Sequence, residues 1–186
     1  MIKTTYILIL FIIFNTSFAN NIGSETGLEL PRYVSLKSND SNIRVGPSKN
    51  YPISIKYIVN DFPLKIVDEY EDWRKIIDFQ NNKGWIHKSL IKGERTGIII
   101  SPNKNKINIY NTVLGKLIGE ISTGSVIHLD KCKIDWCLIY KNNFRGWIKK
   151  SNIWGVKDKE SFNIGFFQIF TDYYFKSINF IEKYIT

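Results

Sequence analysis

Two cysteines and two histidines are the side chains of this sequence best suited to carry out chemistry. Cys132 and Cys137 are close in the chain, and a thiol beside an imidazole can act as a nucleophile with its base. Cysteine and histidine are also preferred ligands of zinc. Neither cysteine has further ligands at the spacing of a zinc finger, so we expect no metal site here.

An internal repeat of roughly 60 residues indicates two small domains in tandem. EDWRKIIDFQNNKGWIHKSL, residues 71–90, returns as IDWCLIYKNNFRGWIKKSNI, residues 134–153. We name residues 31–95 the first repeat and residues 96–156 the second repeat. The aligned pairs include Trp73 with Trp136, Gly84 with Gly146, Trp85 with Trp147 and Arg44 with Tyr110.

The repeat tests the histidines against an internal control. His87 aligns with Lys149, and His128 aligns with Lys65. A position that accepts lysine in an equivalent fold is typical of a solvent-facing site. We therefore predict no catalytic residue, no histidine metal ligand and no cofactor.

The repeat also gives the cysteines a structural role. Cys132 and Cys137 align with Glu69 and Arg74, an opposite-charge pair, which predicts cross-strand neighbours beside a tight turn. In an oxidising compartment two cysteines so placed form a disulfide. A closed loop of about six residues gives only about 2 kcal/mol of stabilisation from chain entropy.

The two repeats read as β structure. Short runs rich in Ile, Val and Tyr are separated by turn signals such as 38–41, 46–50, 80–84 and 141–143. Residues 33–156 show no sustained helical periodicity. The sequence predicts several short strands in a small barrel or sandwich.

Three motifs carry a family resemblance: NIRVGPS (42–48), DWRKI (72–76) and GWIHKSL (84–90). Together they resemble the bacterial SH3 (SH3b) domain, and the order over 31–156 is similar to an exported, two-copy type of that family. The resemblance implies an all-β fold of two tandem SH3-like barrels, residues 31–95 and 96–156. The second repeat lacks the Arg and the Gly-Pro at 108–112, which puts a site on that loop in question.

The same resemblance bears on catalysis. Cell-wall peptidases often carry bacterial SH3 domains, and their nucleophile is a cysteine. Here the two barrels and a tail account for the chain after its leader, so we expect no peptidase domain and no enzyme.

The N-terminus has the pattern of a secretory signal peptide over residues 1–19. Lys3 precedes a short apolar run, and Ser17-Phe18-Ala19 has the small-x-small form of a cleavage site. An uncleaved membrane anchor is the alternative. Residues 20–30 are expected to form a disordered leader. The protein is then exported, to the periplasm or the cell envelope.

The formal net charge is +9, and the basic excess lies on the two repeats. In an exported protein this charge favours anionic envelope polymers or lipid head groups as partners, and not nucleic acid. The alternative is that the charge serves solubility alone.

Five tryptophans suggest a binding groove. Strand alternation places Trp73 on the face opposite Ile76, and Trp136 opposite Ile139, so we expect both tryptophans to face outward. For Trp85 and Trp147, which follow the glycine at the start of a strand, a position in the core is favoured over the groove. Arg44 either binds the carboxylate of a peptide or is a solvated surface residue. The candidate ligand-binding residues are Arg44, Tyr51, Trp73, Trp85, Tyr110, Trp136 and Trp147.

Residues 157–186 form a tail with the pattern of an amphipathic α-helix and a wide aromatic face over 161–185. Its charged residues leave no run long enough to span a membrane. Docking on the barrels, self-association and peripheral contact with a membrane interface all stay open.

Two hypotheses follow. The first is a non-catalytic cell-envelope protein that recognises peptidoglycan, as cell-wall peptide or glycan, through the tandem barrels. The second is an envelope protein–protein adaptor that uses the barrels and the aromatic helix to organise a partner at a membrane.

Overall fold

The structure, a computed structural model, describes residues 21–165, and the expected signal peptide lies outside them. Every strand pairing in this part of the chain is antiparallel, and its helical elements are two 3-10 turns, Lys88–Leu90 and Lys150–Asn152. The all-β prediction is confirmed for the described residues.

Each repeat folds into one seven-stranded sheet. The first has the order β5-β4-β8-β7-β6-β3-β9, and the second has the order β12-β11-β15-β14-β13-β10-β16. The strands of the first are β3 (Arg32–Leu36), β4 (Ser41–Arg44), β5 (Ile53–Tyr57), β6 (Pro63–Tyr70), β7 (Trp73–Ile77), β8 (Lys83–His87) and β9 (Ile91–Lys92). Those of the second are β10 (Thr96–Ile99), β11 (Lys106–Tyr110), β12 (Leu117–Ser122), β13 (Val126–Cys132), β14 (Trp136–Lys141), β15 (Phe144–Lys149) and β16 (Ile153–Trp154).

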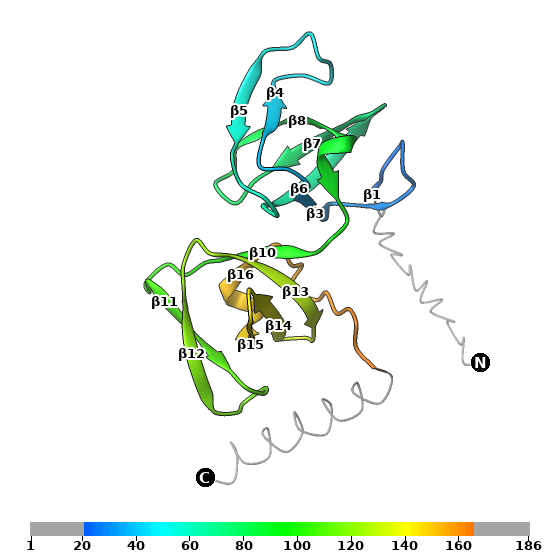
Figure 1. The fold of residues 1–186 in the computed structure, drawn as a ribbon. Coiled ribbons are helices and arrows are strands. Elements are labelled where there is room, and N and C mark those ends of the chain that lie inside the picture. The colour runs from blue at the N-terminus through cyan, green and yellow to red at the C-terminus, as the bar shows by residue number, and fades with distance from the viewer. Residues whose placement is uncertain (1–20, 166–186) are drawn as a thin grey trace, which may run out of the picture.

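The two sheets match strand for strand, which confirms the internal repeat (Figure 1). Register shifts fall at equivalent places, after Ile43 in β4 and after Ile109 in β11. A second equivalent pair follows Ile66 in β6 and Leu129 in β13. A bulge bends a strand, so both sheets curve at the same positions around a core.

Aliphatic side chains at alternate positions fill one core in each repeat. In the first, Ile43, Ile76 and Ile86 are fully buried. In the second, the equivalent Ile109, Ile139 and Ile148 are almost completely buried. The alternation of apolar and polar residues read from the sequence is therefore the alternation between the core and the outer face of each sheet.

Gly84 and Gly146 allow the closest approach of strands in each repeat. A Cβ atom on Gly84 would lie 2.3 Å from Cγ2 of Ile43 and 2.9 Å from the carbonyl oxygen of Arg44. A Cβ atom on Gly146 would lie 2.4 Å from Cγ2 of Ile109 and 3.0 Å from the carbonyl oxygen of Tyr110. This packing explains why the Gly-Trp pair occurs twice, since only glycine fits where β8 pairs with β4 and where β15 pairs with β11.

The leader differs from the expectation of disorder over 20–30. Residues 21–30 form a hairpin of β1 (Asn21–Ile22) and β2 (Glu29–Leu30). Its turn is held by the carboxylate of Glu69, which accepts hydrogen bonds from the backbone N–H groups of Glu25 and Thr26 at 3.0 and 2.9 Å. Leu30 joins the first core. The prediction of disorder was wrong for these residues because the contact is distant in sequence.

The tail also differs from its expectation. Residues 157–165 are not helical, and Phe162 forms an isolated antiparallel bridge with Cys132 through hydrogen bonds of 3.1 and 3.2 Å. The prediction of a helix from residue 161 onwards is therefore wrong for residues 161–165, because the backbone of Phe162 pairs with Cys132 at the end of β13. The rest of that prediction lies outside the described residues. Within residues 21–165, no helix is long and apolar enough to cross a membrane.

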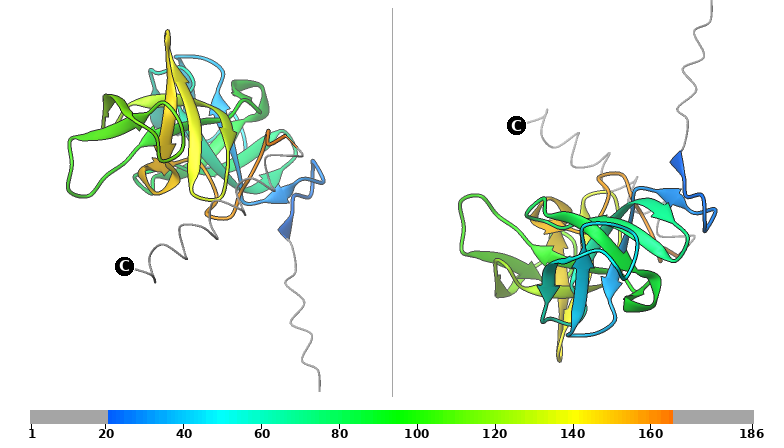
Figure 2. Two further views of the ribbon diagram at one scale, coloured as in Figure 1. Left: turned by 90° about the horizontal axis from the view of Figure 1, so that it is seen from below. Right: turned by 90° about the horizontal axis from the view of Figure 1, so that it is seen from above.

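Polar and aromatic contacts join the two repeats. The Ser35 and Thr96 hydroxyls lie 2.6 Å apart, and the Thr96 hydroxyl donates to the carbonyl oxygen of Asp61 at 2.6 Å. The rings of Tyr33 and Trp154 pack edge to face at 5.2 Å. The N-terminal hairpin and the C-terminal segment lie side by side (Figure 2), with Lys157 3.1 Å from Glu29.

Candidate functional site

The strand register gathers the aromatic candidates on the outer face of each sheet. β7 presents Trp73 on the face opposite the buried Ile76, and β14 presents Trp136 opposite Ile139. This placement follows the alternation of residues along each strand. Both indoles are nevertheless largely covered, with exposed fractions of 8% and 9%. They can therefore form the walls of a site, but not flat platforms for stacking.

A pocket of about 260 Å³ opens on the outer face of the first repeat. Two of the predicted residues, Arg44 and Trp73, line it. The other lining residues, which were not among the predicted ligand-binding residues, are Asn42, Lys49, His87, Ser89 and Leu90. Strands β4, β7 and β8, the loop after β4 and the 3-10 turn after β8 contribute these side chains, so the pocket forms only once the sheet is assembled.

The pocket combines an aromatic wall with positive charge. The ring of His87 packs edge to face on Trp73 with centroids 5.4 Å apart, and its Nδ1 lies 2.8 Å from the Ser89 hydroxyl. Arg44 donates through Nη1 to the carbonyl oxygen of Tyr51 at 2.6 Å. None of the lining residues is acidic. An anionic group is the ligand that this charge distribution favours.

Asn42 contributes an unused acceptor. Its Oδ1 atom is buried and accepts no hydrogen bond from the described residues. A buried polar atom without a partner is costly, and such atoms are rare in folded proteins. A donor from a ligand in the pocket would satisfy it.

The second repeat fills the equivalent place with its own side chains. Trp136, Leu138 and Trp147 form a cluster separate from the main core, and Tyr110 and Val113 pack against it. The Tyr110 ring meets Trp136 edge to face at 5.5 Å. The three predicted residues Tyr110, Trp136 and Trp147 are thus brought together, but they contact one another.

The remaining candidates lie beside these two places. Trp85 is half-buried on the outer face of the first repeat, next to Arg44 in register, with Lys75 Nζ 5.8 Å from its ring centre. Trp147 is buried, with Lys133 Nζ at 5.3 Å. Tyr51 is exposed and packs against Gly46, where a Cβ atom would meet its ring at 2.7 Å.

The disulfide prediction is confirmed. Cys132 and Cys137 are bonded and face each other in the register of β13 and β14. Glu69 and Arg74 hold the same register between β6 and β7, and Arg74 Nε lies 3.4 Å from Glu69 Oε1. In the part of the chain that the structure describes, no three His, Cys, Asp or Glu residues gather at a distance suited to a metal ion.

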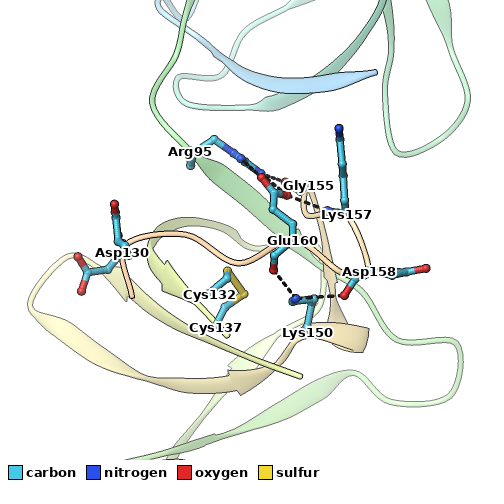
Figure 3. The surroundings of a disulfide bond; sticks show 10 residues. Arg95, Asp130, Cys132, Cys137, Lys150, Gly155, Lys157, Asp158 and Glu160 are labelled. Atoms are coloured by element: carbon cyan, nitrogen blue, oxygen red, sulfur yellow. Dashed lines mark hydrogen bonds and ion pairs between the residues drawn. A yellow bond between two sulfur atoms is a disulfide. The ribbon is translucent and has the colours of Figure 1, made fainter. Parts of the chain in front are cut away.

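The C-terminal segment crosses the disulfide (Figure 3). Arg95 donates to Glu160 through Nη2 at 3.0 Å, and Lys150 Nζ donates to the carbonyl oxygens of Glu160 and Asp158 at 2.7 and 3.2 Å. Burial raises the pKa of the Glu160 carboxyl, but the hydrogen bonds from Arg95 and from the Lys157 N–H outweigh it, so the pKa is lowered. These contacts fix residues 157–162 on the second repeat.

In the first repeat, the carboxylate of Glu69 accepts hydrogen bonds from several groups outside its own strand. Burial alone would raise the pKa of its carboxyl, but hydrogen bonds from Arg32, the Thr26 hydroxyl and the backbone N–H groups of Glu25 and Thr26 lower it to about 2. Arg32 Nη2 lies 2.6 Å from Oε1. Glu69 is therefore an anion at neutral pH with a structural role.

The sheets, the bulges and the close glycine contacts define a small β domain that occurs twice. The family model of the bacterial SH3 domain matches residues 37–93 and 115–155, one segment in each repeat. The chain belongs to the bacterial SH3 domain family. The resemblance inferred from the sequence motifs is confirmed.

Some solved structures show a weaker similarity. NlpC2 from Trichomonas vaginalis aligns at 12% identity and a TM-score of 0.29 over 67% of this chain and 48% of that chain. An NlpC/P60 family protein from Bacillus cereus aligns at 11% identity and a TM-score of 0.29 over 66% of this chain and 55% of that one. The alignment thus spans about half the length of these structures. No curated protein matches the chain.

Proposed function

We propose that this protein is a non-catalytic cell-envelope protein that binds cell-wall peptide or glycan through the outer face of its repeats. The observation that carries the proposal is the pocket of the first repeat, where the cations Arg44 and Lys49 lie beside Trp73 without an acidic neighbour in the lining. Membership of the bacterial SH3 domain family and the disulfide support a role in the envelope.

Co-sedimentation of the full chain, after removal of any signal peptide, with purified peptidoglycan sacculi tests the proposal. We expect the bound fraction to fall between low and moderate salt, because exposed charges are screened. Arg44→Gln should weaken binding about tenfold, as expected for the loss of one charge-assisted contact.

Arg145→Gln is the matched control. Arg145 is also an arginine of the outer face, but it lies on β15 and pairs with Asp130. The same loss of charge there should leave sedimentation unchanged. If both variants lose binding equally, the protein binds sacculi only through its net charge. If the unaltered protein does not sediment with sacculi, the proposal is wrong.

A specific observation favours the second candidate, an envelope protein–protein adaptor. β12 is an edge strand of the second sheet, and the exposed side chains Leu114, Leu117, Ile118 and Phe144 lie on it or near it. An exposed apolar edge can pair with another chain. Such a contact should resist added salt and be lost in Leu117→Lys, whereas wall binding should show the opposite behaviour. The peripheral membrane contact proposed for 161–185 would belong to this candidate.

A further inference from the structure

The two repeats differ at one matched position on the outer face. Arg44 pairs with Trp85 in the first sheet, and Tyr110 pairs with Trp147 in the second, so Arg44 and Tyr110 are structural equivalents. Tyr110 packs its ring against Trp136 and accepts a hydrogen bond from Asn108 Nδ2 at 3.4 Å. In the second repeat, one side chain thus covers the tryptophan and pairs with the asparagine.

In the first repeat the tryptophan is covered to the same extent, with exposed fractions of 8% for Trp73 and 9% for Trp136, but the asparagine is placed differently. Asn42 is the equivalent of Asn108, since each directly precedes the isoleucine that comes before the bulge. The Asn42 Oδ1 atom is buried and has no partner among residues 21–165. Arg44 donates through one nitrogen to the carbonyl oxygen of Tyr51, and its side chain lines the pocket of about 260 Å³.

We infer that the pocket of the first repeat binds the C-terminal residue of a peptide, and that Tyr110 closes the second repeat to the same ligand. The terminal carboxylate pairs with Arg44 and Lys49. The N–H of the same residue donates to Asn42 Oδ1, and its side chain lies against Trp73 and Leu90. The inference rests on the proposed function, because it names the part of a cell-wall peptide that would be recognised.

The chemistry of the lining favours this group over a neutral sugar. Carboxylates form short, charge-assisted hydrogen bonds with guanidinium groups, and the guanidinium of Arg44 keeps donors beyond the one given to Tyr51. A sugar ring would stack on an open indole face, whereas Trp73 is only 8% exposed. The last residue of a peptide supplies an anion and a donor, the carboxylate and the N–H on either side of its Cα atom, and Arg44 and Asn42 offer a partner to each.

The experiment follows the indole N–H signals of the full chain by NMR during titration with N-acetyl-D-alanyl-D-alanine. Its C-terminal amide is the matched neutral probe. We expect the acid to shift the Trp73 signal saturably while Trp136 and Trp147 stay in place. The amide should bind at least about tenfold more weakly, because it lacks the charge that Arg44 recognises.

Two reciprocal variants test the role of the matched position. Arg44→Tyr should close the first repeat and abolish the shift at Trp73. Tyr110→Arg should open the second repeat, so that the acid now shifts Trp136. Arg44→Gln tests the charge with a smaller change, and unchanged signals from the core residues verify that each variant is folded.

Each contrary result has a distinct meaning. Equal binding of acid and amide, or no saturable shift with either, overturns the assignment of the ligand. Shifts at Trp136 or Trp147 in the unaltered protein overturn the closure by Tyr110. Sacculi that still sediment the protein in these cases leave the proposed function standing. Binding of the acid without sedimentation would instead reject the cell-wall function and keep the pocket's chemistry.

Discussion

Glu69 and Arg74 face each other beside the turn between β6 and β7. Cys132 and Cys137 hold the equivalent positions between β13 and β14. In both repeats this pair also anchors a segment from outside the sheet. Glu69 holds the turn of the N-terminal hairpin, and the backbone of Cys132 pairs with Phe162. The same pair of strand positions is thus joined by an ion pair in the first repeat and by a disulfide in the second, and each can be tested separately.

The first prediction concerns Glu69. Its folded-state pKa of about 2 lies below the ordinary value of 4.5, so its contribution to stability is present above pH ~4.5 and is lost as the pH falls toward 2. Glu69→Gln should lower the free energy of unfolding at pH 7 by about 3 kcal/mol and flatten its dependence on acid. Urea denaturation at pH 7 and pH 3 measures both effects.

Asp40→Asn is the control, because Asp40 is an exposed carboxylate with a single ion pair to Lys56 at 3.1 Å. It should change the stability by less than about 0.5 kcal/mol. An acid profile of Glu69→Gln that matches the unaltered protein would show that the carboxyl does not couple folding to pH.

The second prediction concerns the disulfide. Replacing Cys132 and Cys137 together by serine should lower the free energy of unfolding by about 2 kcal/mol, since the closed loop is short. Denaturation of the unaltered protein with and without a thiol reductant should give a similar difference. A much larger loss would mean that the bond does more than restrict the unfolded chain.

At the scale of elements, Gly84 and Gly146 allow β8 to approach β4 and β15 to approach β11 closely. The third prediction is that Gly84→Ala and Gly146→Ala each lower the free energy of unfolding by about 1–3 kcal/mol, because the new Cβ atom overlaps an isoleucine and a backbone carbonyl. Thermal or urea denaturation measures the loss.

Gly93→Ala provides the comparison, because a Cβ atom there meets nothing within 4 Å. It should be neutral or slightly stabilising, since alanine restricts the unfolded chain. Equal stability of Gly84→Ala and Gly93→Ala would refute the steric argument.

The strands were predictable because alternation and turn chemistry are local. Ile76 and Trp73 fall on opposite faces as their spacing requires. The segments on either side of the two sheets, residues 21–30 and 161–165, were not predictable from local sequence. The hairpin over 21–30 depends on Glu69, which is 43 and 44 residues away from the groups that it binds. The helical periodicity at 161–165 yields to strand pairing with Cys132, as tertiary contacts often override local preference.

The candidate site was predictable only in part. Arg44 and Trp73 were found because arginine and tryptophan are conspicuous in small domains. His87 was set aside because Lys149 takes its place in the other repeat, although the structure puts it in the pocket. Asn42, Lys49 and Ser89 are common surface residues in sequence, and only the crossing of strands brings them together.

At the scale of the whole molecule, the contacts between the repeats are polar and partly buried. His128 of the second repeat lies close to two carboxylates of the first, with Nδ1 3.0 Å from Glu94 and Nε2 3.6 Å from Asp61. The buried hydroxyl of Thr96, whose side chain is 1% exposed, stands at the centre of this interface. We therefore expect the repeats to unfold in one transition.

The fourth prediction is that Thr96→Val lowers the Tm by about 3–6 °C, because a buried hydrogen bond is lost and the carbonyl oxygen of Asp61 loses the hydroxyl donor of Thr96. Calorimetry should also show a broader transition as the repeats uncouple. Thr123→Val is the control, since the Thr123 hydroxyl makes only a long, exposed contact of 3.4 Å with Asn105. Two well-separated transitions in the unaltered protein would contradict the coupling.

The two versions of the strand-turn corner also give the halves of the molecule opposite sensitivities. The Glu69–Arg74 corner is indifferent to electron donors but loosens in acid, whereas the Cys132–Cys137 corner is indifferent to acid but opens under reduction. Acid alone or reduction alone therefore opens one of these two residue pairs and leaves the other in place. Because an ion pair joins these positions in one repeat and a disulfide joins them in the other, neither acid alone nor a reductant alone breaks both links.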